Sequence, residues 1–307
     1  MKKNSFLLGL ALGVGVFFFA STFVQKQSTD NENDFPQGYR IVSPHIPKKL
    51  SFAGESVPLS DFDIYERIDR EFIVNTYWHS NTILMIKRAN RWFPVIEPIL
   101  KKYNIPDDFK YIALVESGLE NVTSPKGAKG FWQFTTGTGR KYGLEINDEI
   151  DERYNIEKST EAACRFFLDT DSLFHSWTMA AAAFNFGVNG LTQQVEKQKS
   201  DDYYNLVLGQ ETERYIPRAI AIKEILKDPS RYGFEIKKDQ LYKPLTYYTV
   251  SVDSSISNLA DFAIRYNINY KILKLYNPWL RDNYIDNSEG KTYVIKIPNG
   301  RLDEFPE

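Results

Sequence analysis

The chain has 307 residues, enough for two domains or for one domain with appended segments. Its 38 Lys and Arg residues against 40 Asp and Glu residues leave a net charge of −2, and the lack of a basic excess argues against a nucleic-acid partner. The single cysteine, Cys164, excludes an intramolecular disulfide and a thiolate metal cluster. Three histidines without an H-E-x-x-H motif argue against a zinc hydrolase, so neither a metal nor another cofactor is expected.

The first 25 residues have the pattern of an export segment. Lys2 and Lys3 precede an uncharged, apolar stretch, as in a secretion signal. The stretch is also long enough to cross a bilayer, which takes about 20 residues. Residues 1–25 are therefore expected to be either a cleaved signal peptide or a membrane anchor formed by residues 5–24. Both alternatives place the protein in the cell envelope, on the periplasmic side.

The composition changes after this segment. Residues 26–60 are polar and contain several prolines, which predicts a linker with little structure of its own. From residue 61 apolar residues recur at helical spacing, and residues 61–235 are predicted to form a helical domain. Within it, the segment 82–103 contains Pro94 and Pro98 and is predicted to kink or break there.

Further helices are predicted over residues 161–169, 177–186 and 211–227. The glycine-rich stretch 121–143 is instead predicted to be a loop with short turns. Cys164 falls among apolar residues of the first of these helices, so we expect it to be a buried packing residue rather than a reactive thiol.

A carboxylate lies on the apolar face of another predicted helix. Phe109, Ile112 and Ala113 form its apolar stripe, Glu116 is the next position on that stripe, and Gly118 offers a C-terminal stop. Loss of solvation there would raise the pKa of Glu116 and keep it protonated nearer neutral pH. A glycosidase needs such an acid to protonate a departing glycosidic oxygen. The alternative is that Glu116 lies at a frayed helix end and reaches water.

Four short motifs favour the catalytic interpretation. They are E-S at residues 116–117, G-F-W-Q at 130–133, A-F-N-F-G at 183–187 and E-T-E-R-Y-I-P at 211–217. In this order and spacing they resemble the catalytic domain of the soluble-type (SLT) lytic transglycosylases, lysozyme-like enzymes of bacterial cell-wall turnover. The resemblance covers about residues 85–235. It implies a lysozyme-like helical fold and a peptidoglycan glycan strand as the substrate.

The resemblance also implies a mechanism with one carboxylate. Glu116 would act as the acid and then the base that cleave the β-1,4 bond between N-acetylmuramic acid and N-acetylglucosamine, leaving a 1,6-anhydro end. Hydrolytic glycosidases usually need two carboxylates. Four further carboxylates lie outside the family motifs: Glu120, Glu145, Asp148 and Asp151. Glu120 is the first of them to consider as a second carboxylate.

Five other residues are implied to bind substrate. Ser117 would orient the acid or the substrate, or would only close the helix end. Gln133 would contact the sugar, and Asn185 would hold an N-acetyl or nearby group. Tyr215 would place its hydroxyl close to the acid. Trp132 would stack on a sugar face, with a role in the core as the equal alternative.

The end of the chain resembles a second kind of module. Two β-rich segments, 246–252 and 292–297, enclose two predicted helices, and this β-α-α-β unit over residues 245–300 is similar to LysM modules, which bind chitin-like and peptidoglycan glycans. The loop 252–256 lacks the glycine that the family has there, so the fold is expected more firmly than glycan binding. The predicted class is mainly α, a lysozyme-like helical catalytic domain with a small LysM-like module.

Two other functions stay open at this point. A muramidase would transfer the sugar to water and leave a reducing end. A non-catalytic peptidoglycan-binding scaffold would keep the fold without cleaving. The scaffold is disfavoured because Glu116, Gln133, Asn185 and Tyr215 occur together, which binding alone would not require.

Overall fold

The computed structural model describes residues 41–299, and a compact unit begins at Pro44. The expected signal or anchor lies outside the described residues. Among residues 41–299, no helix is both long and apolar enough to cross a membrane.

A short hairpin corrects the prediction that residues 26–60 form a linker throughout. Strands β1 (Ser51–Phe52) and β2 (Glu55–Ser56) pair antiparallel, and Phe52 is 1% exposed in the main core. The Glu55 carboxylate accepts hydrogen bonds from the backbone N–H groups of Trp177 and Thr178 at 2.7 and 2.9 Å. Strands of two residues are too short to show an alternating pattern in the sequence.

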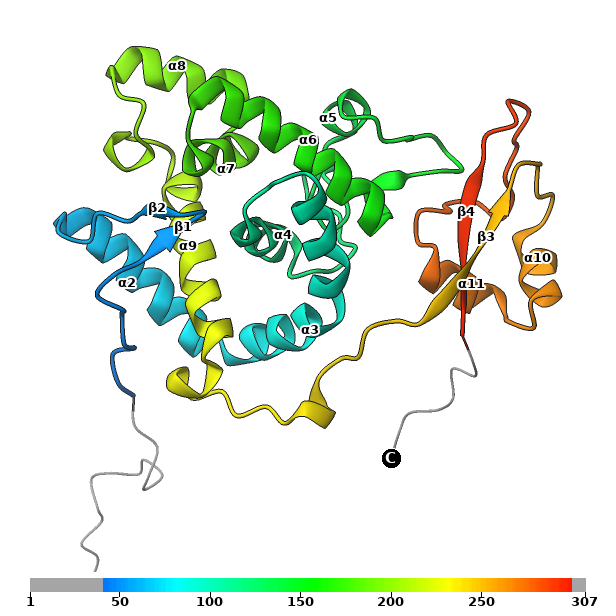
Figure 1. Ribbon diagram of the computed structural model, residues 1–307, viewed down its shortest axis with the longest axis horizontal. Helices are drawn as coiled ribbons and strands as arrows, with labels where there is room; N and C mark the ends of the chain where they lie inside the picture. Colours follow the sequence, from blue (N-terminus) through cyan, green and yellow to red (C-terminus); the bar gives the residue numbers. More distant parts are fainter. Residues whose placement is uncertain (1–40, 300–307) are drawn as a thin grey trace, which may run out of the picture. The chain divides into compact units, whose positions relative to one another are not determined.

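The helical domain surrounds one short central helix, α4 (Figure 1). In chain order its α-helices are α2 (Phe62–Tyr77), α3 (His79–Lys102), α4 (Lys110–Ser117), α5 (Thr136–Lys141), α6 (Ile156–Phe174), α7 (Trp177–Phe186), α8 (Val188–Gln198) and α9 (Gln210–Lys227). Helix α4 packs against α3 and α9, while α2 packs against α9 and α6 packs against α3 and α7. Ile112 and Ala113 of α4 are fully buried, so the predicted apolar stripe faces the core.

Most predicted helices are present, with one clear difference. Helix α7 has the predicted ends, with Ser176 as N-cap and Gly187 after its last residue. Helix α3, however, continues through Pro94 and Pro98 without a break. Both prolines are exposed, so water can reach the carbonyls that lose their helical hydrogen bonds. Two short helices, α5 and α8, were not predicted.

The loop after α4 is folded tightly against a segment near residue 153. Gly130 has φ +80°, and a Cβ atom there would lie 1.9 Å from the Arg153 carbonyl oxygen. Only glycine fits this close approach without moving the backbone. The contact fixes the loop that carries Gln133, because Gln133 donates from its backbone N–H to the Gly130 carbonyl at 3.3 Å.

The C-terminal module is a β-α-α-β unit, as predicted. Its elements are β3 (Tyr247–Val252), α10 (Leu259–Arg265), α11 (Tyr270–Tyr276) and β4 (Tyr293–Pro298). The two strands pair antiparallel, with Val250 opposite Ile295. Leu259, Leu273 and Ile295 are fully buried in a core that is separate from the main one. The predicted class, mainly α with a small β-α-α-β module, is confirmed.

The module contacts the helical domain through the segment 145–157. The backbone N–H of Asp151 donates to the Trp279 carbonyl at 2.9 Å, and that of Arg281 donates to the Glu149 carbonyl at 2.7 Å. The guanidinium of Arg281 lies 4.2 Å from the centre of the Tyr154 ring. Tyr154 is thereby part of the module's core.

Replacing Gly130 by alanine is expected to destabilise the protein by about 3 kcal/mol, because the new Cβ collides with a backbone carbonyl. Gly127→Ala is the matched control, since Gly127 has a similar φ of +79° but nothing within 4 Å of an added Cβ. Urea unfolding should show that the free energy of unfolding of the control falls by only about 1 kcal/mol. Equal losses for the two variants would contradict the close-approach explanation.

Candidate active site

Glu116 lies in the last turn of α4 and points toward α9. Gly118, at φ +62°, ends the helix in the left-handed conformation. The hydroxyl of Tyr215, a residue of α9 that is 1% exposed, donates a hydrogen bond to Glu116 Oε1. Two of the predicted site residues, 99 positions apart, are therefore in direct contact.

The surroundings keep this carboxyl protonated near neutral pH. The pKa of Glu116 is raised to about 7. Burial is the main cause and the nearby Glu211 charge adds to it, whereas the Tyr215 hydrogen bond and Arg218 act in the opposite direction. Burial also raises the pKa of Tyr215 well above its usual value, so its hydroxyl remains a donor. The pair can therefore supply a proton at neutral pH and hold the carboxylate that remains.

Sequence reasoning missed two charged neighbours of the acid. Glu211 and Arg218 form an ion pair at 3.1 Å, and both influence the charge of Glu116. The spacing of Glu211, Tyr215 and Arg218 is i, i+4 and i+7, which places them on one face of α9. The spacing of Glu211 and Tyr215 was visible inside the E-T-E-R-Y-I-P motif, and Arg218 directly follows that motif.

Ser117 makes contacts that close the end of α4. Its Oγ lies 2.8 Å from the Phe131 carbonyl and 3.2 Å from the Ala113 carbonyl, and it accepts the Leu119 N–H at 3.1 Å. These bonds connect the helix carrying Glu116 to the loop that carries Gln133. No bond joins Ser117 to Glu116 within the described residues.

Gln133 and Asn185 are each oriented by hydrogen bonds. Gln133 donates from Nε2 to the carbonyls of Gly130 and Val122 at 2.7 and 3.1 Å, which leaves its Oε1 as the group available to a ligand. Asn185, near the end of α7, accepts the Thr212 hydroxyl at 2.7 Å. Thr212 belongs to the same motif as Tyr215, so this bond ties the third motif to the fourth.

Trp132 takes the alternative role in the core. Its side chain is fully buried, its Nε1 donates to Thr160 Oγ1 at 2.9 Å, and its ring packs against Phe167 and Phe184. The expectation that it stacks on a sugar is wrong, because neither face of the ring is open.

The four carboxylates outside the motifs are held elsewhere or exposed. Glu120 pairs with Arg88 at 2.6 Å, Asp151 forms a two-point contact with Arg153, and Glu145 accepts the Tyr293 hydroxyl at 3.1 Å. Asp148 is exposed. Among residues 41–299, no group of three or more His, Cys, Asp or Glu side chains is placed to hold a metal.

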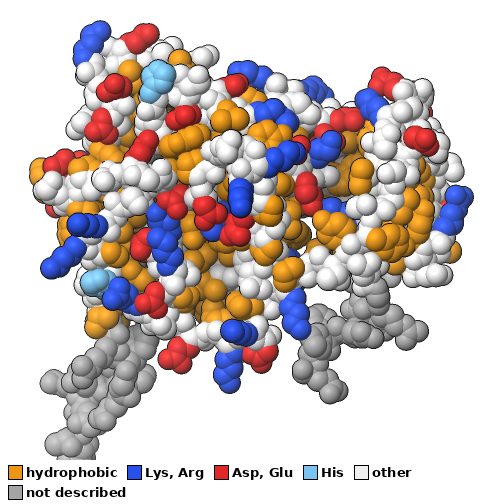
Figure 2. All heavy atoms as spheres, viewed as in Figure 1, with side chains coloured by type: hydrophobic (Ala, Val, Ile, Leu, Met, Phe, Trp, Pro, Cys, Tyr) orange, Lys and Arg blue, Asp and Glu red, His pale blue; other side chains and the backbone are white. Residues whose placement is uncertain are grey.

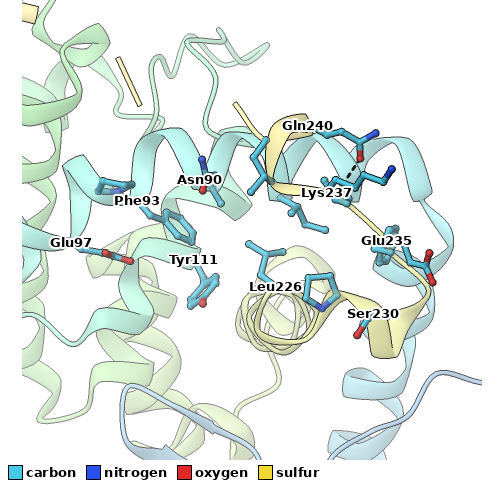
Figure 3. A pocket seen from close by; sticks show the side chains of 16 residues that line it. Asn90, Phe93, Glu97, Tyr111, Leu226, Ser230, Glu235, Lys237 and Gln240 are labelled. Carbon is cyan, nitrogen blue, oxygen red and sulfur yellow. Dashed lines mark hydrogen bonds between the residues drawn. The ribbon is translucent and has the colours of Figure 1, made fainter. Parts of the chain in front are cut away.

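The cavity drawn in Figure 3 lies apart from these residues. It has a volume of about 830 Å³ and lies between α3, α9 and the chain after α9, where Asn90, Phe93, Leu226 and Gln240 line it (Figure 3). None of the predicted site residues lines it. Gln133 instead lines a pocket of about 340 Å³, and Ser117 lines another of about 350 Å³.

The charged surface is mixed in sign. Figure 2 shows acidic and basic side chains interspersed over the face in view, with apolar side chains between them. This pattern fits the net charge of −2.

Replacing Glu116 by glutamine is expected to stabilise the protein at pH 8 more than at pH 4. Between pH 4.5 and 7 the unfolded chain ionises at Glu116 while the folded chain keeps the proton, so the wild type loses stability as pH rises, by up to about 3 kcal/mol. Urea unfolding across this range tests the prediction. The exposed Glu66→Gln serves as the control, and a flat difference between Glu116→Gln and wild type would contradict the burial of the acid.

Comparisons with known proteins agree with the motifs. Residues 94–207 match the family described as Transglycosylase SLT domain, and residues 248–301 match the Soluble lytic transglycosylase C-terminal LysM-like domain. The chain is similar to Membrane-bound lytic murein transglycosylase D of Escherichia coli (strain K12), at 29% identity over 238 residues, 76% of this chain and 51% of the relative. The protein of that name from Escherichia coli O6:H1 matches with the same values.

The chain thus spans about half the length of these curated relatives. The two domain matches follow each other in the order of the helical domain and the β-α-α-β unit. Over these two stretches the chain is similar to lytic transglycosylases, with a match to the SLT domain followed by a match to the LysM-like domain.

Proposed function

We propose that this chain cleaves the β-1,4 bond between N-acetylmuramic acid and N-acetylglucosamine in peptidoglycan and leaves a 1,6-anhydro end. The observation that carries the proposal is the buried Glu116, whose pKa is raised to about 7 and whose carboxyl accepts the Tyr215 hydroxyl. A carboxyl group in this state is available as a general acid at neutral pH.

In the first step Glu116 donates its proton to the bridging oxygen. The bond from C1 of N-acetylmuramic acid to that oxygen breaks, and N-acetylglucosamine leaves with a 4-hydroxyl group. The substrate's own N-acetyl group stabilises the positive charge at C1. In the second step the Glu116 carboxylate takes the proton of the C6 hydroxyl, O6 bonds to C1, and the acid is regenerated.

The contacts of Glu116 support a mechanism with one carboxylate. Glu211 is the only other carboxylate whose charge affects Glu116 among the described residues, and it is already paired with Arg218. A second free carboxylate would be needed to activate water in an inverting hydrolase, or to attack C1 in a retaining one. The substrate's C6 hydroxyl removes that need.

The other site residues position the sugar in this scheme. Gln133 offers Oε1 to a sugar hydroxyl or N–H, since its Nε2 is held by two carbonyls. Asn185 offers its Nδ2, which donates to no residue in the part of the chain that the structure describes. The Ser117 hydroxyl donates to the Phe131 carbonyl and so joins the end of α4 to the loop that carries Gln133.

The proposed location is the cell envelope, where peptidoglycan lies. Lys2, Lys3 and the uncharged stretch that follows support export or anchoring at a membrane. The relatives named membrane-bound lytic murein transglycosylase agree with that location. The LysM-like module is proposed to add contacts with the glycan strand.

A digest of purified peptidoglycan with the full chain tests the proposal. Mass spectrometry should find products lighter by one water, about 18 Da, than those of a muramidase. Glu116→Gln should lower the rate at least about 1000-fold, because the acid and the base are lost together. Glu66→Gln, exposed on α2, is the control and should cleave like the wild type.

Three results would each overturn part of the proposal. Reducing ends would make the protein a muramidase, and Glu120 would then be tested first as the second carboxylate. Cleavage by Glu116→Gln at the wild-type rate would remove Glu116 as the acid. No product from the wild type would favour the non-catalytic scaffold.

Cleavage by the wild type is expected to fall as pH rises through about 7, because the acid must be protonated. Tyr215→Phe removes a hydrogen bond that lowers the pKa of Glu116, so the fall should move to higher pH. Initial rates on peptidoglycan between pH 5 and 9 measure both. A fall at the same or a lower pH in Tyr215→Phe would contradict the assigned effect of the hydrogen bond.

A further inference from the structure

Helix α9 contains a buried proline in the motif that carries Tyr215. Pro217 has no backbone N–H, so it cannot donate the helical hydrogen bond that the Glu213 carbonyl would otherwise receive. Pro94 and Pro98 of α3 leave similar gaps, but both are exposed, so water can reach the carbonyls there. Because Pro217 is buried, the carbonyl opposite it is expected to need a donor from the protein itself.

The hydroxyl of Tyr203 lies at this gap. It is 3.0 Å from the Glu213 carbonyl and 2.7 Å from the Thr212 carbonyl, and the side chain is 2% exposed. Burial raises the pKa of Tyr203 well above its usual value, while a hydrogen bond from the Ile216 backbone acts in the opposite direction, so the hydroxyl remains a donor. A phenol is thus inserted among the backbone groups of α9 where Pro217 interrupts the hydrogen bonds.

The loop before α9 holds Tyr203 in place by its own hydrogen bonds. The Asp202 carboxylate accepts the backbone N–H of Tyr204 at 2.9 Å. Gln198, at the end of α8, donates to the Val207 carbonyl at 2.9 Å and accepts the Val207 N–H at 2.8 Å. The position of the phenol is therefore fixed by the loop as well as by α9.

The turn of α9 that Tyr203 contacts carries two side chains of the site. Thr212 donates its hydroxyl to Asn185 at 2.7 Å, and Tyr215 donates its hydroxyl to Glu116. Thr212 and Tyr215 are both buried, so a shift of this turn would move both hydroxyls at once. Tyr203 lies outside the four motifs and bonds to the backbone of the turn.

We propose that Tyr203 is a positioning residue whose hydroxyl takes the place of the N–H that Pro217 lacks. It thereby holds the α9 turn that places Tyr215 against Glu116. The effect on cleavage rests on the proposed function, whereas the effect on the turn does not. The alternative is that Tyr203 is a packing residue, in which case its ring matters and its hydroxyl does not.

Hydrogen exchange of the full chain, followed by mass spectrometry of its peptides, tests the proposal without cleavage. Tyr203→Phe keeps the ring and removes the hydroxyl, and the amides of residues 210–216 are expected to exchange about tenfold faster than in the wild type. Tyr204→Phe is the matched control, because that neighbouring hydroxyl is buried and has no hydrogen-bond partner within the described residues. The control should leave exchange over residues 210–216 unchanged.

A second substitution is expected to rescue the first. Pro217→Ala gives α9 a backbone N–H that can donate to the Glu213 carbonyl. Tyr203→Phe combined with Pro217→Ala should therefore return the exchange of residues 210–216 toward the wild-type rate. A packing role for Tyr203 predicts no such rescue, because Pro217→Ala restores a hydrogen bond rather than a ring contact.

Initial rates on soluble peptidoglycan strands test the effect on cleavage. The kcat of Tyr203→Phe should fall about tenfold with KM unchanged, and Pro217→Ala should restore it in the double variant. The fall in rate at high pH should also move to higher pH, because a looser Tyr215 hydrogen bond lowers the pKa of Glu116 less. Tyr204→Phe should match the wild type in both measurements.

Three results would overturn the proposal. The first is equal exchange over residues 210–216 in Tyr203→Phe and Tyr204→Phe, and the second is no rescue by Pro217→Ala. The third is faster exchange in Tyr203→Phe with an unchanged rate and pH profile, which would leave Tyr203 a structural role alone. If the wild type releases no anhydro product, the proposed function fails instead, and the exchange measurements still decide whether Tyr203 holds the turn.

Discussion

The burial of one carboxyl group at the end of α4 is the constraint on which the site depends. An ionised carboxylate is costly in a place with little water, so the helices around α4 hold Glu116 in its protonated form near pH 7. The packing of α4 against α9 also brings Tyr215 to that carboxyl. The packing of α4 against α9 therefore both shifts the pKa of Glu116 and orients its carboxyl group.

The pairing of buried charges distinguishes this acid from the others. Glu71 is fully buried but is held by two arginines, and the buried Asp151 is held by Arg153 at two points. Glu116 has a neutral phenol as its hydrogen-bond partner instead. Because its charge is not compensated by a direct ion pair, Glu116 can gain and lose a proton near neutral pH.

The C-terminal module is connected to the site through one segment of the helical domain. Residues 145–157 bond to the module, and the Arg153 carbonyl in this segment lies against Gly130. Gly130 in turn accepts hydrogen bonds from Gln133. Continuous contacts thus join the module to a loop that lines a pocket of the site.

The sequence alone determined the order of the motifs and the ends of some helices, such as α7 and the C-terminal end of α4, because the cap Ser176 and the stop Gly118 act on their own neighbours in the chain. The position of Glu116 on an apolar stripe likewise follows from local spacing. Only the tertiary structure decided that Trp132 packs in the core and that Glu120 pairs with Arg88. These contacts join residues more than 25 positions apart, and such partners leave no periodic signal in the sequence.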